Sequence, residues 1–493
     1  MCAAFALVNA FTVDQMDYWW TVKLGSDLWT TRQLPTANTL AFTPMREPYV
    51  EQQWLAQLIL AAIHTRWGLE GGLLLRGALF ALGIGLLYYL CRRAGAYPTI
   101  AGVVCLGAAV LTFPGATVRP QLLALPLFML FLAGTTAWQG RAWTSAALPL
   151  AMVVWVNVHG SFPMGLVLVG CALAGRLWEV RAPAAIAADP LARRLALALA
   201  LCTAAVLVNP YGLHIVPWLI GFITIHGSGQ ADLPMASEWL PTSLGQRVGL
   251  YYFASVAAVV VVLIRTGPPA PAAGFRLLLF GALGLSIIRS TTWWGFVMAP
   301  PLARGGSQWL DQVHGERPLT APLGPAPGAD TPPRRALHGA LLVVCLLAAV
   351  WSVPMVRGAV FHEALSIADP TQPRAAAEFV ATLPGGLRLF NDLDWGGYLG
   401  WRLAPVDRVF ADERFGDYPP AVYHDYARVS EARAGWDALL DGYGVDALIL
   451  SRQHQPDLID ALAGHPAWQP VYADEQAVVY LRQDAGAASA TER

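Results

Sequence analysis

The chain has 493 residues, of which 56% are hydrophobic and 13% are charged, and its formal net charge is −1. Soluble domains usually carry about 25% charged residues, so this composition leaves too few polar groups to cover a water-facing surface. The near-zero net charge predicts no bulk attraction to nucleic acid, so we expect no nucleic-acid partner. Apolar runs recur from Met1 to Val356, whereas charges appear every few residues from Arg357 onward. This pattern predicts a polytopic α-helical membrane domain over 1–356 and a water-soluble domain over 357–484.

A membrane span needs about 20 apolar residues, and runs of about 10–14 more often lie in the membrane interface. By this criterion we predict about eleven spans, at 1–13, 72–91, 97–113, 120–138, 143–157, 161–177, 195–208, 247–265, 274–287, 290–303 and 336–356. The first run is short, with no basic residue before it, so we expect that its helix has lost its beginning. Two shorter runs, Trp54–Ile63 and Ile215–Ile225, predict helices that lie in or dip into the interface.

The arginines decide the orientation, because loops on the cytoplasmic side of a membrane carry an excess of Lys and Arg. With Met1 inside, the pairs Arg92–Arg93, Arg193–Arg194 and Arg334–Arg335 all fall inside. The stretch 317–335, rich in Pro and Gly, is then an inner linker, and the domain over 357–484 lies outside. The tail 485–493 is polar and rich in small residues, which predicts disorder.

With this orientation the unusual polar residues gather at the outer face. Ionisable groups at membrane depth are costly, so they usually face a water-filled cavity and indicate function. Asp17 is the hardest to explain otherwise, because an unpaired carboxylate among tryptophans would be expensive. We read residues 14–53 as an outer loop. The outer-face residues are Asp17, Glu51, Arg119, Asn157, His159, Glu238 and Arg289.

Structural roles compete with this interpretation. The run Asn209-Pro210-Tyr211-Gly212 has the composition of a helix end and turn. Trp19 and Trp20 could belong to an interfacial aromatic belt, and Arg119 and Arg289 could extend towards the interface from the helix ends. His159, beside a glycine, could be a packing residue.

The order of these motifs resembles bacterial membrane proteins of the GT-C glycosyltransferase superfamily. The matching runs are Asp17-Tyr18-Trp19-Trp20, Glu51-Gln52-Gln53-Trp54-Leu55, Arg119-Pro120-Gln121, Asn157-Val158-His159-Gly160 and Asn209-Pro210-Tyr211-Gly212. In the C-terminal part, Asp394-Trp395-Gly396-Gly397-Tyr398 followed by Asp412 is similar to the Trp-Trp-Asp-Tyr-Gly region and trailing aspartate of oligosaccharyltransferase catalytic subunits.

The resemblance implies transfer of a sugar from a polyprenyl-phosphate carrier to an acceptor at the outer face of a bacterial plasma membrane. Asp17 matches the acidic residue that acts on the acceptor, and Glu51 is the next candidate for this role. Arg119, Arg289 and His159 would bind the leaving phosphate, where negative charge develops. The remaining candidates for substrate binding are Asn157, Glu238, Asp394, Tyr398 and Asp412.

The chain departs from the family in two places. Asn38 stands where the family often has a second loop aspartate, so a divalent cation is possible but not strongly implied. The Trp-Trp-Asp-Tyr-Gly motif is incomplete, so transfer to asparagine sequons is not implied. The acceptor could be a glycan, a lipid or a protein, and membrane lipids are expected partners.

The C-terminal domain reads as a small α/β layer domain. Buried parallel-type strands are predicted at 387–390, 408–410 and 447–450, helices at 418–434 and 436–443, and a hairpin at 469–473 and 477–481. Asp392, Asp394, Asp412 and Arg414 follow strand ends, where the sites of α/β domains usually lie, although local capping and pairing would explain them equally well.

A non-enzymatic glycolipid transporter or cell-envelope assembly factor is the alternative function. Transporters of known folds often show inverted repeats and ionisable residues at the middle of the membrane. No such repeat is visible, and the polar groups lie at one face, which favours a one-sided active site.

Overall fold

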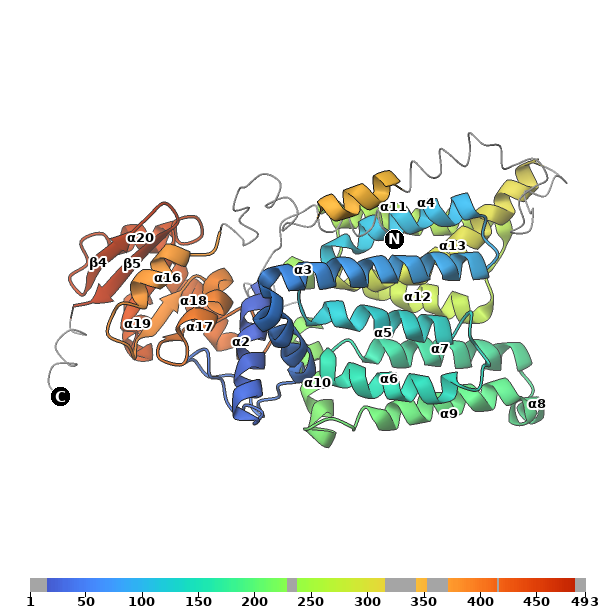
Figure 1. The fold of residues 1–493 in the computed structure, drawn as a ribbon, viewed down its shortest axis with the longest axis horizontal. Coiled ribbons are helices and arrows are strands. Elements are labelled where there is room, and N and C mark those ends of the chain that lie inside the picture. The colour runs from blue at the N-terminus through green and yellow to red at the C-terminus, as the bar shows by residue number, and fades with distance from the viewer. Residues whose placement is uncertain (1–15, 228–236, 315–342, 353–370, 415, 484–493) are drawn as a thin grey trace. The chain divides into compact units, whose positions relative to one another are not determined.

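The computed structural model describes residues 16–227, 237–314, 343–352, 371–414 and 416–483 (Figure 1). The chain divides into two compact units. The helical unit contains the described parts of Trp67–Gly212 and Ser237–Ile367. The α/β unit contains those of Asp14–Arg66, Leu213–Ala236 and Ala368–Arg493. The predicted first span, the inner linker and the C-terminal tail lie outside the described residues.

Most helices of the helical unit follow the predicted apolar runs. The helices of this unit are α4 (Pro98–Thr112), α5 (Pro120–Gly134), α6 (Thr144–Val158), α7 (Pro163–Val180), α8 (Pro183–Ala188), α9 (Pro190–Ala205), α11 (Arg247–Thr266), α12 (Pro271–Ser286) and α13 (Thr291–His314), with the 3-10 turns η1 (Phe113–Gly115), η3 (Ser237–Trp239) and η4 (Ile288–Ser290). Helix α8 lies outside the predicted runs, and α13 extends beyond the predicted end at 303. Residues 343–351 are also helical, within the last predicted span.

Helix α3 (Trp54–Arg93) joins the predicted interfacial helix at 54–63 to the predicted span at 72–91. Its backbone breaks at Gly68, where φ is 63° and ψ is −156°, a conformation open to glycine but costly for other residues. The residues before Trp67 belong to the α/β unit and those from Trp67 onward to the helical unit.

Proline begins many of these helices, because its fixed φ suits the first turn and its missing N–H is not needed there. Pro98, Pro120, Pro163 and Pro271 all occupy such positions. At the start of α9, Asp189 adds a side-chain cap by accepting a hydrogen bond from the Ala192 backbone N–H at 2.7 Å.

Aromatic side chains form the centre of the helical unit. Phe128 of α5 is fully buried, and its ring contacts Trp293 at 4.7 Å, Phe280 at 5.7 Å and Phe296 at 6.1 Å between centroids. These rings come from α12 and α13, so α5 is bound to both helices by one cluster. Buried aromatic pairs of this kind contribute about 0.5–1.5 kcal/mol each beyond the burial of their area.

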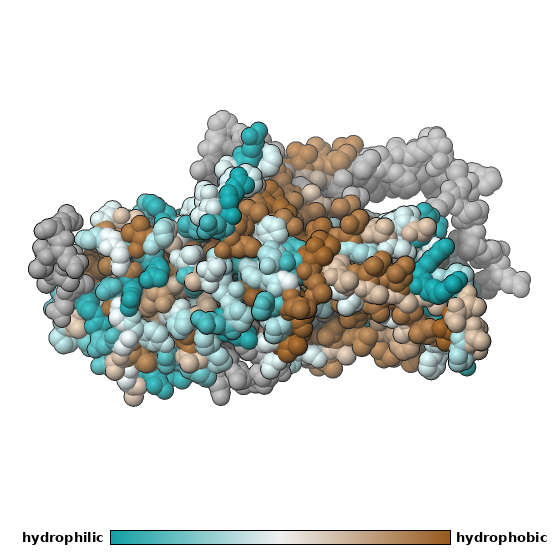
Figure 2. Space-filling model, turned by 90° about the horizontal axis from the view of Figure 1, so that it is seen from below, coloured by the Kyte–Doolittle hydropathy of each residue, from teal (hydrophilic) through white to brown (hydrophobic). Residues whose placement is uncertain are grey.

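Three helices among the described residues are long and apolar enough to cross a membrane: Trp54–Arg93, Pro163–Val180 and Arg247–Thr266. The outward faces of many helices are apolar too; Leu150 is 68% exposed, Ile264 76% and Leu278 72%. Figure 2 shows hydrophobic residues, in brown, gathered over the surface of the helices. Exposed apolar surface on this scale fits contact with lipid rather than water. The total of about eleven spans stays a prediction.

The C-terminal segment forms a five-stranded sheet in the order β2-β1-β3-β5-β4. The strands are β1 (Arg388–Asn391), β2 (Arg408–Val409), β3 (Ala447–Ser451), β4 (Trp468–Ala473) and β5 (Ala477–Arg482). β1 pairs in parallel with β2 and β3, and β5 pairs antiparallel with β3 and β4. The three parallel-type strands and the hairpin are therefore confirmed.

Five helices and a turn accompany this sheet: α16 (Arg374–Val380), η5 (Leu393–Trp395), α17 (Gly396–Leu403), α18 (Pro420–Ser430), α19 (Trp436–Tyr443) and α20 (Pro456–Leu462). The predicted helix at 436–443 has the predicted bounds. The helix predicted at 418–434 is shorter, because Pro419 precedes its first turn and Ala432 adopts a φ of 48°.

The N-terminal segment of the α/β unit corrects one prediction. Residues 16–31, read as loop, form helix α2 (Met16–Thr31). Burial explains the difference: Tyr18, Trp20, Val22 and Leu24 are all buried, and α2 packs against α17. Packing of an apolar surface stabilises a helix that a polar-flanked sequence of this length would not form alone.

The chain after α2 then joins the sheet. The Phe42 N–H donates to the Val409 carbonyl at 3.0 Å, and the Val409 N–H donates to the Leu40 carbonyl at 3.1 Å. Ala41 pairs in parallel with Val409, next to the short edge strand β2. Residues 40–42 therefore cover an edge that would otherwise be open to pairing with another chain.

A pair of glycines in α7 tests the packing of α7 against α12. A Cβ at Gly175 would lie 2.4 Å from the Ala272 backbone nitrogen, whereas a Cβ at Gly170 would meet nothing within 4 Å. We expect Gly175→Ala to lower the free energy of unfolding by about 1–3 kcal/mol through overpacking. Gly170→Ala, the matched control, should be neutral or slightly stabilising. Thermal unfolding in detergent measures both, and equal melting temperatures for the two variants would contradict this packing.

Candidate functional site

The ten candidate residues fall into two groups, one in each unit. Asp17, Glu51, Asp394, Tyr398 and Asp412 belong to the α/β unit, and Arg119, Asn157, His159, Glu238 and Arg289 belong to the helical unit.

Asp17 lies in the first turn of α2, half-buried among aromatic rings. The Trp20 indole N–H donates to its Oδ1 at 3.2 Å, and the Thr21 hydroxyl donates to its carbonyl at 2.5 Å. A carboxylate in the first turn of a helix is also stabilised by the helix dipole. The side chain is thus oriented within a fixed aromatic setting, as a group that accepts a proton from an acceptor hydroxyl must be.

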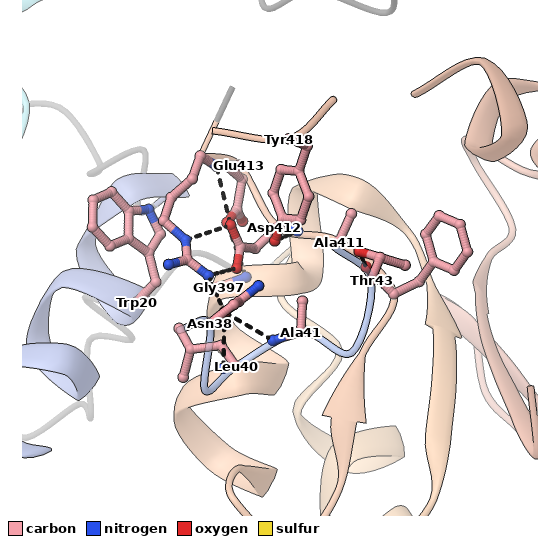
Figure 3. A network of polar contacts seen from close by, with 12 residues as sticks. Trp20, Asn38, Leu40, Ala41, Thr43, Gly397, Ala411, Asp412, Glu413 and Tyr418 are labelled. Carbon is pink, nitrogen blue, oxygen red and sulfur yellow. Dashed lines mark hydrogen bonds and ion pairs between the residues drawn. The ribbon is translucent and has the colours of Figure 1, made fainter. Parts of the chain in front are cut away.

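Asp412 and Arg414 form a buried ion pair beyond β2. Arg414 donates from Nη2 to Asp412 Oδ2 at 2.6 Å and from Nε to Oδ1 at 2.8 Å, and both side chains are almost fully buried. The third contact of the guanidinium is Asn38 Oδ1, at 2.8 Å from Nη2 (Figure 3). Trp20 completes the surroundings, 5.7 Å from the guanidinium carbon. The bidentate geometry matches the planar fork of arginine.

Glu51 is connected to this pair through Tyr49. The Tyr49 hydroxyl accepts from Arg414 Nη1 at 3.1 Å and donates to Glu51 Oε2 at 2.7 Å, while Gln57 Nε2 donates to Glu51 Oε1 at 2.6 Å. Burial raises the pKa of Glu51, although the Arg414 charge and these two hydrogen bonds oppose the shift. Both oxygens of Glu51 accept hydrogen bonds inside the unit, an arrangement suited to positioning Tyr49 and Arg414.

Glu413 is a functional candidate that the sequence analysis missed. It is buried, and its Oε2 accepts a hydrogen bond from the Gly397 N–H at 2.9 Å. Burial, and then the charges of Asp412, Asp17 and Asp394, raises the pKa of Glu413 well above its usual range. This shift favours the protonated carboxyl, which can donate a hydrogen bond, over the carboxylate. In the sequence, the feature that could have identified Glu413 was its place beside Asp412, shortly after strand β2.

Asp394 lies with Asp392 and His454 at the carboxyl ends of β1 and β3. The potential ligand atoms of these three residues lie within 4.8 Å of one another, and they form a possible metal-binding group in the described part of the chain. His454 Nδ1 is 2.7 Å from Asp392 Oδ2. That hydrogen bond, and then the charges of both aspartates, raises the pKa of His454 against the effect of burial. Tyr398 lies elsewhere, in α17, with its ring 5.4 Å from that of Trp19.

In the helical unit, two arginines converge on one carboxylate. Arg119, at the start of α5, contacts Glu238 Oε2 at 3.0 Å, and Arg289 of η4 contacts Glu238 Oε1 at 2.7 Å. Arg289 also donates to Gln121 Oε1 at 2.8 Å and lies 5.0 Å from the centre of the Trp239 ring. Three charged side chains from distant segments therefore carry a net charge of +1 at one place.

Asn157 lies in the last turn of α6, and His159 directly follows this helix in the same unit. The Asn157 amide donates to the Val153 carbonyl at 2.7 Å and to the Val208 carbonyl at 2.9 Å, which ties α6 to the chain after α9. His159 Nδ1 lies 2.8 Å from the Ser161 hydroxyl, and the charges of Arg289 and Arg119 act on its ring. A protonated His159 would be repelled by both arginines, so a neutral ring suits this place better.

The Asn209 motif is a turn, as its composition indicates. The Asn209 side chain donates to the Val206 carbonyl at 2.8 Å and accepts from the Tyr211 N–H at 2.8 Å, and Gly212 has a φ of 53°. These local hydrogen bonds explain the motif as a turn after α9.

No protein-family model and no curated protein matches the sequence. Solved structures share its fold. The oligosaccharyltransferase of Archaeoglobus fulgidus in the apo form matches with a TM-score of 0.57 and 12% identity, over 98% of this chain and 74% of that one. ArnT from Cupriavidus metallidurans, bound to undecaprenyl phosphate, matches with a TM-score of 0.52 and 18% identity, over 97% of each chain. The arabinofuranosyltransferase AftD from mycobacteria matches with a TM-score of 0.52 and 16% identity, over 97% of this chain and 41% of that one. The expected GT-C-like fold, with a helical part and a small C-terminal sheet, is confirmed.

Asp417 gives the α/β unit a testable pH dependence. Burial, together with the charges of Glu51 and Asp412 and against those of Arg414 and Arg46, raises its pKa from 3.8 to about 7. Between these values the folded state binds more protons than the unfolded state, so this group makes the free energy of unfolding fall as pH rises from about 4 to about 7. Asp417→Asn removes the dependence. The variant should match the wild type near pH 4 and exceed it in stability near pH 8.

The measurement is thermal unfolding in detergent at both pH values. Glu475→Gln, in the exposed turn of the β4–β5 hairpin, is the control and should follow the wild type throughout. A variant at Asp417 that is equally destabilised at both pH values would refute the burial argument.

Proposed function

We propose that the protein is a membrane glycosyltransferase that transfers a sugar from a polyprenyl-phosphate carrier to an acceptor at the extracytoplasmic face of a bacterial plasma membrane. The convergence of Arg119 and Arg289 on Glu238 carries the proposal. It offers a positively charged site, lined by Trp239 and Gln121, at the ends of apolar helices. Such a site suits the phosphate of a carrier whose lipid tail lies within the membrane.

The reaction that this proposal requires is a displacement at the anomeric carbon. The acceptor hydroxyl forms a bond to that carbon as the bond to the phosphate oxygen breaks, and the carrier leaves as polyprenyl phosphate. Negative charge grows on the phosphate, where fixed cations stabilise it most. Arg119 and Arg289 would supply these cations, and Glu238 would hold them in place when the carrier is absent.

Asp17 would take the proton of the acceptor hydroxyl. Its orientation by Trp20 supports this role, and so does the neighbouring Glu413, whose raised pKa leaves it able to donate a hydrogen bond to the acceptor. Asp394, Tyr398 and Asp412 lie in the same unit, and we assign them to acceptor binding or to support of Asp17. The group of Asp392, Asp394 and His454 could bind a divalent cation, but no step above depends on one.

The phosphate site is tested by replacing its arginines. Arg289→Ala and Arg119→Ala should each reduce the transfer of a labelled hexose from polyprenyl phosphate by about 10²-fold or more, the effect of removing a group that stabilises transition-state charge. Lysine should rescue only part of the activity, because it restores the charge without the bidentate fork. Arg247→Ala, at the exposed first residue of α11, is the control. Wild-type turnover in both alanine variants would leave the two arginines as structural residues only.

The acceptor side is tested by Asp17→Asn, which keeps the shape of the side chain and removes its charge. Loss of general-base catalysis should lower turnover by about 10²–10⁴-fold while binding of the carrier survives. Asp27→Asn is the matched control, because Asp27 lies at the other end of α2 and pairs with Lys23 at 2.7 Å. Full activity in Asp17→Asn would exclude Asp17 as the general base and make Glu51 the next candidate for that role. Carrier binding by a wild-type protein that shows no transfer would instead favour an assembly factor.

A further inference from the structure

The α/β unit contains a pocket of about 140 Å³ that neither the buried ion pair nor Asp17 explains. Three segments line it: the loop 46–50, Pro217–Trp218 at the start of α10 (Ile215–Gly227), and Gly416–Asp417. Tyr49, whose hydroxyl bridges Arg414 and Glu51, forms part of one wall. The pocket therefore adjoins the network that holds the candidate site together.

The pocket carries charges of both signs, from Arg46 and from Glu47 and Asp417, and Arg46 is held by hydrogen bonds. The Arg46 backbone N–H donates to the Asp417 carbonyl at 2.7 Å, and its Nη1 donates to the Gly416 carbonyl at 3.2 Å. A Cβ at Gly221 would lie 2.3 Å from Arg46 Nη2, so the glycine leaves room for this guanidinium against α10. The half-buried carboxylate of Asp417 accepts no hydrogen bond from any residue that the structure describes. Within the described residues, the oxygen atoms of this carboxylate are therefore left to a ligand in the pocket that Asp417 lines.

The apolar surface of the pocket is aromatic. Trp218 stacks on Phe222 with centroids 5.5 Å apart and planes at 24°, which holds the indole in one orientation. Tyr49 adds a second ring. An aromatic surface next to a carboxylate and a guanidinium is the chemistry that recognises a pyranose, because its C–H face packs on a ring and its hydroxyls both donate and accept. The opposite charges of Arg46 and Asp417 make the pocket a poor site for a bare phosphate.

The exposed apolar surface of helix α10 indicates that a lipid carries the sugar. Its sequence is almost wholly apolar, and its side chains at Val216, Ile220 and Ile223 are 42%, 60% and 58% exposed. A short helix with such a surface lies in the interface of a membrane rather than in water. A pocket that begins at Pro217 and Trp218 of this helix would open at the level of the lipid headgroups.

We propose that this pocket is a carbohydrate subsite that binds a neutral pyranose at the head of a lipid, with Trp218 under the ring and with Asp417 and Arg46 bound to its hydroxyls. The proposal rests on the proposed function, of which it defines one substrate as a glycolipid.

The test is saturation-transfer NMR on the full chain in lipid nanodiscs, near pH 8, with methyl pyranosides of glucose, galactose, mannose and N-acetylglucosamine as probes. We expect transfer to the ring protons of at least one of them. Trp218→Ala and Asp417→Asn should each weaken that binding by about tenfold, the effect of losing a hydrogen bond to a charged group or a buried aromatic contact. Tyr472→Ala, which removes a ring stacked on Phe379 in the same unit, is the matched control and should bind as the wild type does.

Asp417→Asn keeps the side-chain volume, so this variant remains informative if Trp218→Ala fails to fold. The absence of transfer from all four probes to the wild type, or unchanged binding in a folded Asp417→Asn, overturns the subsite. A second arm separates a lipid-borne from a free sugar: a polyprenyl-phosphate hexose should bind more tightly than its methyl pyranoside and should compete with it. Pyranoside binding without any transfer activity would refute the proposed function and leave the subsite standing. Sugar transfer by Asp417→Asn with an unchanged KM would refute the subsite and leave the proposed function standing.

Discussion

The ion pair between Asp412 and Arg414 is the interaction on which the α/β unit depends. Burying two charges costs several kcal/mol for each ion, and the cost is offset only when the geometry is good and the remaining donors are satisfied. Arg414 meets this condition by reaching Asn38 and Tyr49 as well as Asp412. These contacts join the chain before α3 to the chain after β2.

Several features of the candidate site follow from this arrangement. With residues 38–49 held against the sheet, Leu40 packs on Trp20 and Leu24, and α2 has a surface on which to lie. Trp20 then faces the Arg414 guanidinium on one side and donates to Asp17 at its indole nitrogen. Asp17 therefore owes its orientation to a charge pair almost 400 residues further along the sequence. Glu413, between the two paired residues, is carried into the same interior.

Local pattern was enough to predict the strands of the sheet, but not their order. β1 and β3 are short apolar runs, as expected of buried strands, and β4 and β5 flank Asp474, which accepts hydrogen bonds from the Gln476 and Ala477 N–H groups in the turn. The motifs also sufficed to predict the GT-C-like fold, although at 12–18% identity the solved structures share little beyond that fold.

Other features could not be predicted, because they depend on contacts between distant segments. Helix α2 has no strong periodicity of its own and is stabilised by α17. The contact between Asn38 and Arg414 spans 376 residues, and nothing in either segment points to the other. Asn38 was noticed only as a missing aspartate, whereas its amide oxygen completes the shell of a buried arginine. The convergence of Arg119 and Arg289 on Glu238 likewise joins three separate segments.

The pairing of residues 40–42 with β2 has a practical consequence for work on fragments of this protein. A fragment that began after residue 370 would retain all five strands but lose the segment that lies along their outer edge. Its β2 would offer open N–H and carbonyl groups, and Arg414 would lose the oxygen atoms of Asn38 and Tyr49. Such a fragment would be prone to self-association and would misrepresent the native surface, for example as an antigen. A faithful excised version needs residues 16–53 supplied alongside, fused or co-expressed.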